Sequence, residues 1–222
     1  MTTPFFKTVF AILFKDLRAE TRSRELVSAM GLFTLLSILA FSFALELNRD
    51  AEQEVVAGVL WVTLIFASIL GLNRSLAQER EQGNLDAMMI APVSRIAVYL
   101  GKAMGNLLFT FLVGVFLLPL MTILFDMPLL NVEMLAVLFL GLAGLAAIGT
   151  LLATMTVQTR ARETLLPIAM LPVALPIILT VVRGTNGMLN DGDISLALGT
   201  LLVVDIIYLT LGSLLFEYVT ED

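Results

Sequence analysis

The chain contains no cysteine and no histidine among its 222 residues, and only 14% of its residues are charged. Without cysteine there is no disulfide bond and no thiolate metal ligand, whichever compartment the loops face. Without histidine, the commonest general acid or base is also missing. The charged fraction is far below the roughly 25% of an average soluble protein. These absences argue against an enzyme and against a soluble domain.

Hydrophobic residues make up 59% of the chain, and its mean hydropathy is +0.96. They gather in six apolar runs, each close to the roughly 20 residues with which a helix crosses a hydrocarbon core of about 30 Å. None of the runs alternates in the manner of a barrel strand. The sequence therefore predicts an all-α integral membrane protein, a single transmembrane domain over residues 1–222. The predicted spans are 26–45, 55–72, 103–125, 134–157, 164–182 and 194–216.

The basic residues are distributed unevenly between the loops. Orientation in a membrane follows Lys and Arg rather than the net charge, which is −6 here. Of the 13 Lys and Arg residues, all but Arg49 and Arg183 lie before the first span, in the 73–102 loop or in the 158–163 loop. We therefore predict that both termini and these two loops face the cytoplasm. A cleaved signal peptide is the competing interpretation of residues 1–45, but its charged region would be atypically long and would contain acidic residues.

Residues 4–24 have the pattern of an amphipathic helix that lies flat on a membrane. Phenylalanine, leucine and valine recur there every three or four residues, with lysine and arginine between them. Asp16 and Glu20 stand four residues apart, and like charges at that spacing cost an isolated helix a few tenths of a kcal/mol. A partner of complementary charge would offset this cost. Alternatively, the face is solvated and Glu20 pairs with Arg24.

A polar stretch at residues 76–95 interrupts the apolar chain. Gly83 and Asn84 provide a helix start, Asp86 follows in the first turn, where the helix dipole favours an anion, and Pro92 ends the helix. Methionine suits a surface that fills a groove on another protein. The pattern predicts a short docking helix, or else a helix that rests on the bilayer. Its apolar face comprises Leu85, Met88 and Met89.

Several motifs accompany this stretch. They read Glu79-Arg80-Glu81-x-Gly83-x-Leu85-Asp86-x-Met88-Met89-x-Ala91-Pro92-Val93-x-Arg95 with Gly101-Lys102, Lys15-Asp16-Leu17-Arg18-Ala19-Glu20-x-Arg22-Ser23-Arg24-Glu25, Leu72-Asn73-Arg74-Ser75, and Arg162-Glu163-x-Leu165-Leu166-Pro167-Ile168-x-x-Leu171-Pro172-x-x-x-Pro176. The first resembles the coupling-helix signature of type-2 ABC exporter membrane subunits. Together they resemble the heme exporter membrane subunits of cytochrome c maturation, protein B of that system, over nearly the whole chain. Leu13 stands where that family leads us to expect Phe.

The resemblance implies a type-2 ABC exporter-like fold and a permease subunit in a bacterial inner membrane. Such a subunit couples ATP hydrolysis to heme export, or to release of a heme-loaded chaperone, in cytochrome c biogenesis. The ATP would be hydrolysed by a separate ABC ATPase subunit, in keeping with the absence of a P-loop motif from this sequence. The other implied partners are a second copy in a homodimer, a heme-handling membrane protein, a heme chaperone and the lipid bilayer, but no nucleic acid. This chain would bind no cofactor or metal itself, because heme and ATP would be handled by its partners.

The resemblance also implies which residues face the ATPase. In the coupling helix these are Glu79, Arg80, Glu81, Gly83, Leu85, Asp86, Met88, Met89, Pro92 and Arg95. In the amino-terminal helix and the second loop they are Asp16, Glu20, Arg22, Glu25, Arg162 and Glu163.

Polar residues within the spans leave two alternatives open. Asp205 lies near the middle of the last span, where a carboxylate is costly enough to suggest a function. A proton-coupled secondary transporter that uses Asp205 is one alternative, and a type-2 ABC exporter of another substrate is the other. Asp205 could equally be a protonated packing residue. Lys102 and Asn106, one turn apart, could form a polar path, although Lys102 lies close enough to the interface for its ammonium group to reach it.

The remaining span features predict packing. Small residues allow helices to approach closely, and prolines bend the helix that contains them. Tyr99 and Tyr218 lie near span ends, where tyrosines commonly act as interfacial anchors. The small residues are Gly101, Gly105, Gly141, Gly144 and Ala147, and the prolines are Pro167, Pro172 and Pro176.

Overall fold

The computed structural model describes residues 4–45, 49–81, 83, 92–157, 159, 161–190 and 192–219, without the side chains of residues 49–54 and 162. Every regular element in these ranges is a helix. The helices are α1 (Phe5–Ser23), α2 (Glu25–Leu45), α3 (Arg49–Glu81), α5 (Arg95–Phe125), α6 (Val132–Val157), α7 (Arg162–Leu189) and α8 (Ser195–Val219).

Six of the described helices are long and apolar enough to cross a membrane, by length and composition. This confirms the predicted all-α membrane class. Three helices extend well beyond the predicted spans, since α3 continues through residues 73–81, α5 begins at Arg95 and α7 continues to Leu189. Polar sequence marks the end of an apolar span but does not break a helix, and residues 73–81 contain neither glycine nor proline.

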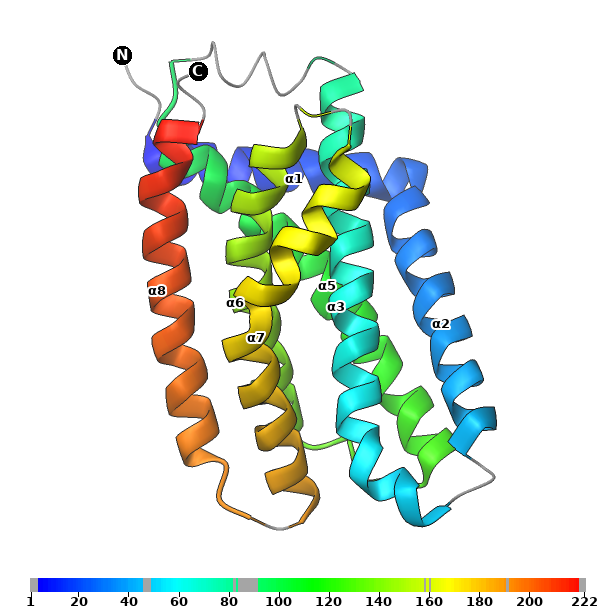
Figure 1. Cartoon of the computed structure of the whole chain (residues 1–222). Helices are drawn as coiled ribbons and strands as arrows, with labels where there is room; N and C mark the ends of the chain where they lie inside the picture. The colour runs from blue at the N-terminus through cyan, green and yellow to red at the C-terminus, as the bar shows by residue number, and fades with distance from the viewer. Residues whose placement is uncertain are drawn as a thin grey trace.

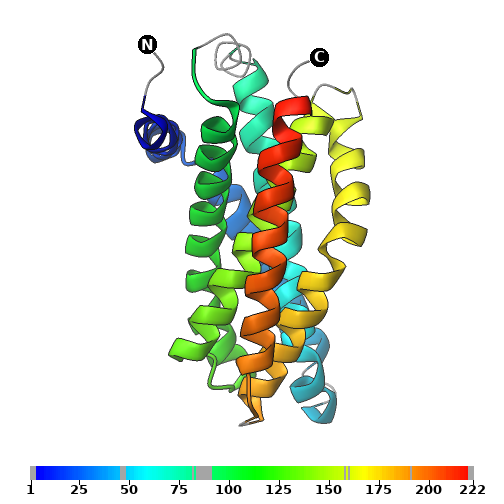
Figure 2. The same ribbon diagram turned by 90° about the vertical axis from the view of Figure 1, so that its left-hand side faces the viewer.

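Helices α2 to α8 run side by side, and α1 lies across one end of them (Figure 1). Turned by 90°, the molecule shows α1 end-on beside α5 (Figure 2). This close approach requires Gly101 of α5, because a Cβ there would lie 2.9 Å from Cβ of Ile12 and 3.0 Å from the carbonyl oxygen of Val9. We call this end of the molecule the α1 end.

Helix α1 buries one face against the bundle and leaves its phenylalanines exposed. Thr8, Val9, Ile12 and Leu13 are buried, while the exposed aromatic residues are Phe5, Phe6, Phe10 and Phe14. An exposed aromatic face next to membrane-spanning helices is what an interfacial helix needs. The placement of α1 in the headgroup region remains a prediction.

Helix α6 occupies the centre of the bundle and contacts α3, α5, α7 and α8. A Cβ on Gly141 would lie 2.6 Å from the side chains of both Trp61 and Val181, and a Cβ on Gly144 would lie 2.7 Å from Ile177. The predicted close approach at these small residues is therefore confirmed. Across the same contact, Trp61 Nε1 donates a hydrogen bond of 2.9 Å to the Thr185 hydroxyl and so joins α3 to α7.

Helix α7 bends along its length (Figure 1) and contains the three prolines that were predicted to bend it. Between Pro172 and Pro176, the carbonyl of Val173 accepts a hydrogen bond of 2.5 Å from the Tyr208 hydroxyl. Such a donor helps to satisfy a backbone disturbed by proline.

The predicted role of Tyr99 as an interfacial anchor is wrong. Its side chain is 0% exposed, and its hydroxyl donates a hydrogen bond of 3.0 Å to the Ala147 carbonyl. The ring occupies space that a side chain at Gly212 would fill. Tyr99 lies near the end of a predicted span, but it is buried because Gly212 of α8 leaves room for its ring.

Candidate functional site at the α1 end

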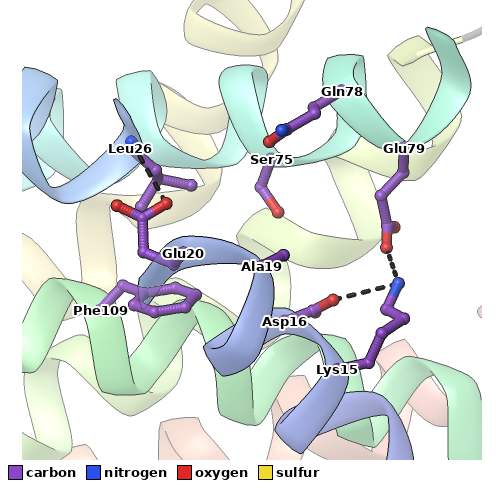
Figure 3. A pocket seen from close by; sticks show the side chains of 9 residues that line it. All are labelled: Lys15, Asp16, Ala19, Glu20, Leu26, Ser75, Gln78, Glu79 and Phe109. Atoms are coloured by element: carbon purple, nitrogen blue, oxygen red, sulfur yellow. Dashed lines mark hydrogen bonds and ion pairs between the residues drawn. The ribbon is translucent and has the colours of Figure 1, made fainter. Parts of the chain in front are cut away.

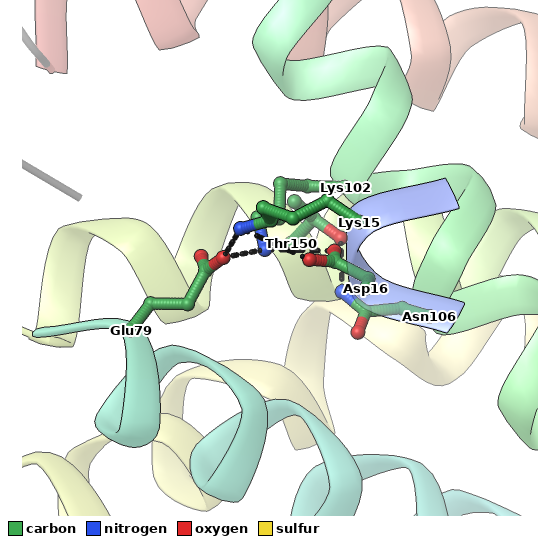
Figure 4. A network of polar contacts seen from close by, with 6 residues as sticks. All are labelled: Lys15, Asp16, Glu79, Lys102, Asn106 and Thr150. Atoms are coloured by element: carbon green, nitrogen blue, oxygen red, sulfur yellow. Dashed lines mark hydrogen bonds and ion pairs between the residues drawn. The ribbon is translucent and has the colours of Figure 1, made fainter. Parts of the chain in front are cut away.

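Two lysines and two carboxylates from three helices form a cluster at the α1 end (Figure 4). Lys102 Nζ lies 2.8 Å from Asp16 Oδ2, and Lys15 Nζ lies 3.1 Å from Asp16 Oδ1. Both lysines also contact Glu79 Oε1. The cluster joins α1, which carries Lys15 and Asp16, to the last turn of α3 and to the start of α5. We call these four residues the ion cluster.

The ion cluster is electrically balanced and mostly buried. The side chains of Lys102, Glu79 and Asp16 are 3%, 8% and 11% exposed, whereas that of Lys15 is 41% exposed. Burying charge is costly unless each charge is paired, and each of these groups has an opposite charge beside it. Burial lowers the pKa of Lys15, but the Glu79 and Asp16 carboxylates outweigh it and raise that pKa above 10.5.

The ammonium group of Lys102 ends between the two carboxylates of the ion cluster, one of them on α1. That this group lies at the membrane interface stays a prediction. The prediction that Lys102 and Asn106 form a polar path gains no support. Asn106 Nδ2 instead donates a hydrogen bond of 2.9 Å to the Thr150 hydroxyl on α6. The two residues bind different partners and serve different helix contacts.

The ion cluster fixes the two helix ends that flank residues 82–91. Glu79 lies in the last turn of α3, and Lys102 lies in the second turn of α5. Gly83 follows in a turn with φ of 68°, a conformation that suits glycine, and its N–H donates to the Arg80 carbonyl at 3.0 Å. The predicted docking residues Leu85, Asp86, Met88 and Met89 lie outside the described residues, and their role stays a prediction.

Arg80 provides a second anchor next to Glu79. Its guanidinium donates a hydrogen bond to the carbonyl of Val157, the last residue of α6. Val157 precedes the second loop that was predicted to face the cytoplasm. Adjacent residues of α3 therefore connect the 82–91 segment both to the ion cluster and to the start of this second loop. The other described members of the predicted set nearby, Glu81 and Pro92, are exposed, and Arg95 is half-buried.

Glu20 caps helix α2. Its carboxylate accepts hydrogen bonds from the backbone N–H groups of Leu26, at 3.3 Å, and Val27, at 2.8 Å. Free N–H groups and the helix dipole make such an N-terminus a good partner for an anion. The alternative interpretation, a Glu20–Arg24 pair, is therefore wrong. Because Asp16 is bound within the ion cluster, both carboxylates find their partners within the chain, and their spacing no longer requires a partner protein.

Three other predicted interface residues are exposed at the α1 end. Arg22 has no part in the ion cluster, and Glu25 forms a 3.0 Å ion pair with Arg74 in which both side chains are about half exposed. Glu163, at the start of α7, and Arg74 both line a cavity of about 370 Å³ next to α3. The side chain of Arg162 lies outside the described residues.

A polar pocket of about 220 Å³ adjoins the ion cluster (Figure 3). Its lining includes the carboxylates of Asp16, Glu20 and Glu79, contributed by α1 and α3. All three have partners within the chain, as described above. Within the described ranges, no group of three or more Asp, Glu, His or Cys residues could hold a metal ion. The paired charges link α1, α3 and α5 to one another.

Asp205 is separate from this site and lies between α8, α6 and α7. Its side chain is 5% exposed, and neither carboxylate oxygen has a hydrogen-bond partner in the described part of the chain. As predicted, Asp205 lies near the middle of the last helix, and it is buried there. A Cβ added at Gly144 of α6 would meet Oδ1 of Asp205.

Comparison with known proteins identifies a family. The family described as CcmB protein matches residues 7–217. A protein named heme exporter protein B from Rhodobacter capsulatus is 29% identical over 194 residues, which cover 85% of this chain and 89% of the relative. Proteins of the same name are 29% identical over 182 residues in Paracoccus denitrificans, with 80% and 84% covered, and 25% identical over 159 residues in Pseudomonas aeruginosa, with 71% of each covered.

Proposed function

The chain belongs to the CcmB protein family, and from that premise we propose that it is the permease subunit of an ABC transporter that handles heme in cytochrome c biogenesis. The relatives above are each named heme exporter protein B, which supports heme as the molecule handled. ATP hydrolysis takes place in a separate ABC ATPase subunit. The permease converts that work into movement of its helices, which either exports heme or releases a heme-loaded chaperone.

The ion cluster is the observation that carries this proposal. A partner that pushes on residues 82–91 acts on the ends of α3 and α5, which Glu79 and Lys102 tie to α1. Buried, paired charges resist separation, because each would be left unpaired in a low-dielectric environment. Force on the segment is therefore transmitted into the bundle rather than absorbed by a loose loop.

The exposed charges at the α1 end support this end as the docking side, and membership of the family supports an ATPase partner. The ATPase docks at the α1 end, with Met88 and Leu85 in a groove of the ATPase and with Arg22, Glu25 and Glu163 around it. The complete transporter contains two copies of this chain, a heme-handling membrane protein and a heme chaperone. It resides in a bacterial inner membrane with both termini in the cytoplasm.

The docking step is tested by placing charge on the apolar face. Met88→Glu puts an unpaired ion into the proposed groove, which should cost several kcal/mol and release the ATPase during co-purification. Asn84→Asp is the control, since it adds the same charge to the same segment outside the apolar face. Normal co-purification and normal ATP hydrolysis with Met88→Glu would show that the segment does not dock.

The orientation is tested by labelling. The chain has no cysteine, so Asn84→Cys introduces a single reactive site into the 82–91 segment. An impermeant thiol reagent should modify it in inverted membrane vesicles and not in intact cells. Labelling from outside intact cells would reverse the proposed topology.

Heme is held by partner proteins in this proposal. Heme iron is commonly ligated by His, Cys, Met or Tyr, and this chain offers only 11 Met and 3 Tyr. The hydroxyls of Tyr99 and Tyr208 already donate to backbone carbonyls. The purified subunit should therefore show no stoichiometric Soret absorbance. A stable heme spectrum that is lost on replacing Tyr208 or a membrane Met would restore direct heme binding by this chain.

Asp205 supports the second candidate function, proton-coupled transport. Its two carboxylate oxygens have no hydrogen-bond partner within the described chain, as expected of a group that binds and releases a proton. If this carboxylate couples transport, Asp205→Asn should abolish transport without disturbing assembly. If ATP hydrolysis alone supplies the work, the same variant should transport normally, because an amide replaces a protonated carboxyl group at nearly the same size.

A further inference from the structure

An apolar groove lies where α1 turns into α2. Its volume is about 320 Å³, at the lower end of the roughly 300–1,000 Å³ of ligand pockets. Leu17 of α1 and Val27 of α2 form one wall, and Leu108, Phe109 and Leu112 of α5 form the other. Leu108 and Leu112 are 43% and 56% exposed and belong to a helix long and apolar enough to cross a membrane. We therefore expect the groove to open towards lipid.

The rim of this groove carries positive charge. Arg24 lines it, is exposed, and has no acidic partner among the described residues. Glu20 is the acidic residue of the rim, but its carboxylate is already bound by the N–H groups of Leu26 and Val27. The groove thus combines apolar walls with one available guanidinium group.

Arg24 also adopts an unusual backbone conformation. Its φ of 56° places it in the left-handed region as the residue that ends α1. Glycine is the usual residue at such a position, because a side chain is strained there. Strain at a residue whose side chain has no partner within the fold points to a role for that side chain.

We propose that this groove binds one anionic phospholipid of the leaflet at the α1 end. An acyl chain lies along Leu108 and Leu112, and the phosphate group accepts hydrogen bonds from Arg24, whose planar fork of donors matches a phosphate. The groove is a poor site for heme, because no His, Cys, Met or Tyr lines it. The bound lipid braces α1 against α2 and α5. The inference does not depend on which molecule the permease handles.

The first test measures head-group preference. The full-length protein is purified in detergent, equilibrated with phosphatidylglycerol or phosphatidylcholine, and examined by native mass spectrometry. One phosphatidylglycerol should remain per chain under conditions that remove phosphatidylcholine. Arg24→Gly should lower this retention about fivefold, which corresponds to the roughly 1 kcal/mol of one basic residue near an anionic surface. Glycine adopts the left-handed conformation freely, so this variant keeps the fold.

Matched variants complete the test. Arg22→Gln removes an exposed charge of α1 outside the groove and should leave retention unchanged. Leu112→Trp fills the groove and should exclude either lipid, whereas Phe116→Trp, at a residue 71% exposed on the same helix, should not. Equal retention of both lipids with and without Arg24 would overturn the proposal. The proposal would also be wrong if Leu112→Trp dissociated a dimer while the number of lipids bound per chain stayed the same. That result would mean that a second copy of the chain, and not a lipid, occupies the groove.

Discussion

Lys102 and Lys15 contact the same two carboxylates at very different depths, so the same substitution at each tests whether burial gives the ion cluster its strength. The side chain of Lys102 is 3% exposed and that of Lys15 is 41% exposed. Either substitution leaves two carboxylates and one lysine, but Lys102→Met leaves Asp16 and Glu79 with only the half-exposed Lys15, whereas Lys15→Met leaves them with the buried Lys102. Breaking a buried pair by removing one partner costs about 3–5 kcal/mol. The 41% exposed side chain of Lys15 is partly solvated, so we expect its removal to cost about 1 kcal/mol or less.

These magnitudes translate into melting temperatures. For a domain of about 150–250 residues, 1 kcal/mol shifts Tm by roughly 2–4 °C. Lys102→Met should therefore lower Tm by roughly 6–20 °C, and Lys15→Met by no more than about 4 °C. Fluorescence of Trp61, the only tryptophan, reports unfolding directly, because its side chain is 0% exposed and bridges α3 and α7.

A double variant separates charge imbalance from lost packing. Lys102→Met combined with Glu79→Gln removes one charge of each sign and leaves the Lys15–Asp16 pair. It should recover part of the Tm that Lys102→Met loses, because no buried charge is then in excess. Equal Tm shifts for the two lysine variants would refute the view that burial gives the ion cluster its strength. A double variant less stable than Lys102→Met would refute the view that balanced charge stabilises it.

Three further outcomes follow from other contacts. Gly141→Ala should destabilise the fold by about 1–3 kcal/mol in thermal melts, because its Cβ would lie 2.6 Å from Trp61. Its control, Gly199→Ala, should be neutral or stabilising by up to about 1 kcal/mol, because its Cβ would have nothing within 4 Å. Because the folded pKa of Lys15 is raised above 10.5, its contribution to stability is fully present below pH 10.5 and is lost as pH rises through the folded value. Tm should therefore fall less steeply above pH 10.5 in Lys15→Met than in the wild type. Arg80→Gln should reduce permease-stimulated ATP hydrolysis while the ATPase still co-purifies, since it removes a charged hydrogen bond of about 1.5–3 kcal/mol to the end of α6.

The sequence predicts the spans because membrane helices obey a length and composition rule that acts locally. Helices α2, α6 and α8 end within about three residues of the predicted spans. The prediction fails for α3, which continues from residue 72 to residue 81, for α5, which starts at residue 95, and for α7, which continues from residue 182 to residue 189. In each case the helix continues into more polar sequence, and hydropathy alone gives no signal for this.

The partners of the charged residues could not be predicted in the same way. Lys15 and Glu79 are 64 residues apart, and Asp16 and Lys102 are 86 residues apart. Their contact depends on α1 crossing α5, which in turn depends on the absence of a side chain at Gly101. The glycines were visible in the sequence, but the helix that would pack on them was not. Glu20 was misjudged for a related reason, because only the turn at Arg24 brings the N-terminus of α2 back to its carboxylate.

The consecutive residues Glu79 and Arg80 explain how one helix end can serve two loops. Neighbouring side chains on an α-helix point about 100° apart, so these two side chains reach different parts of the bundle. Glu79 reaches the lysines of α1 and α5, and Arg80 reaches the last carbonyl of α6. A displacement of the 82–91 segment therefore strains the ion cluster and the start of the second loop together. A single docked partner can then act on α1, α5 and α6 through one turn of α3.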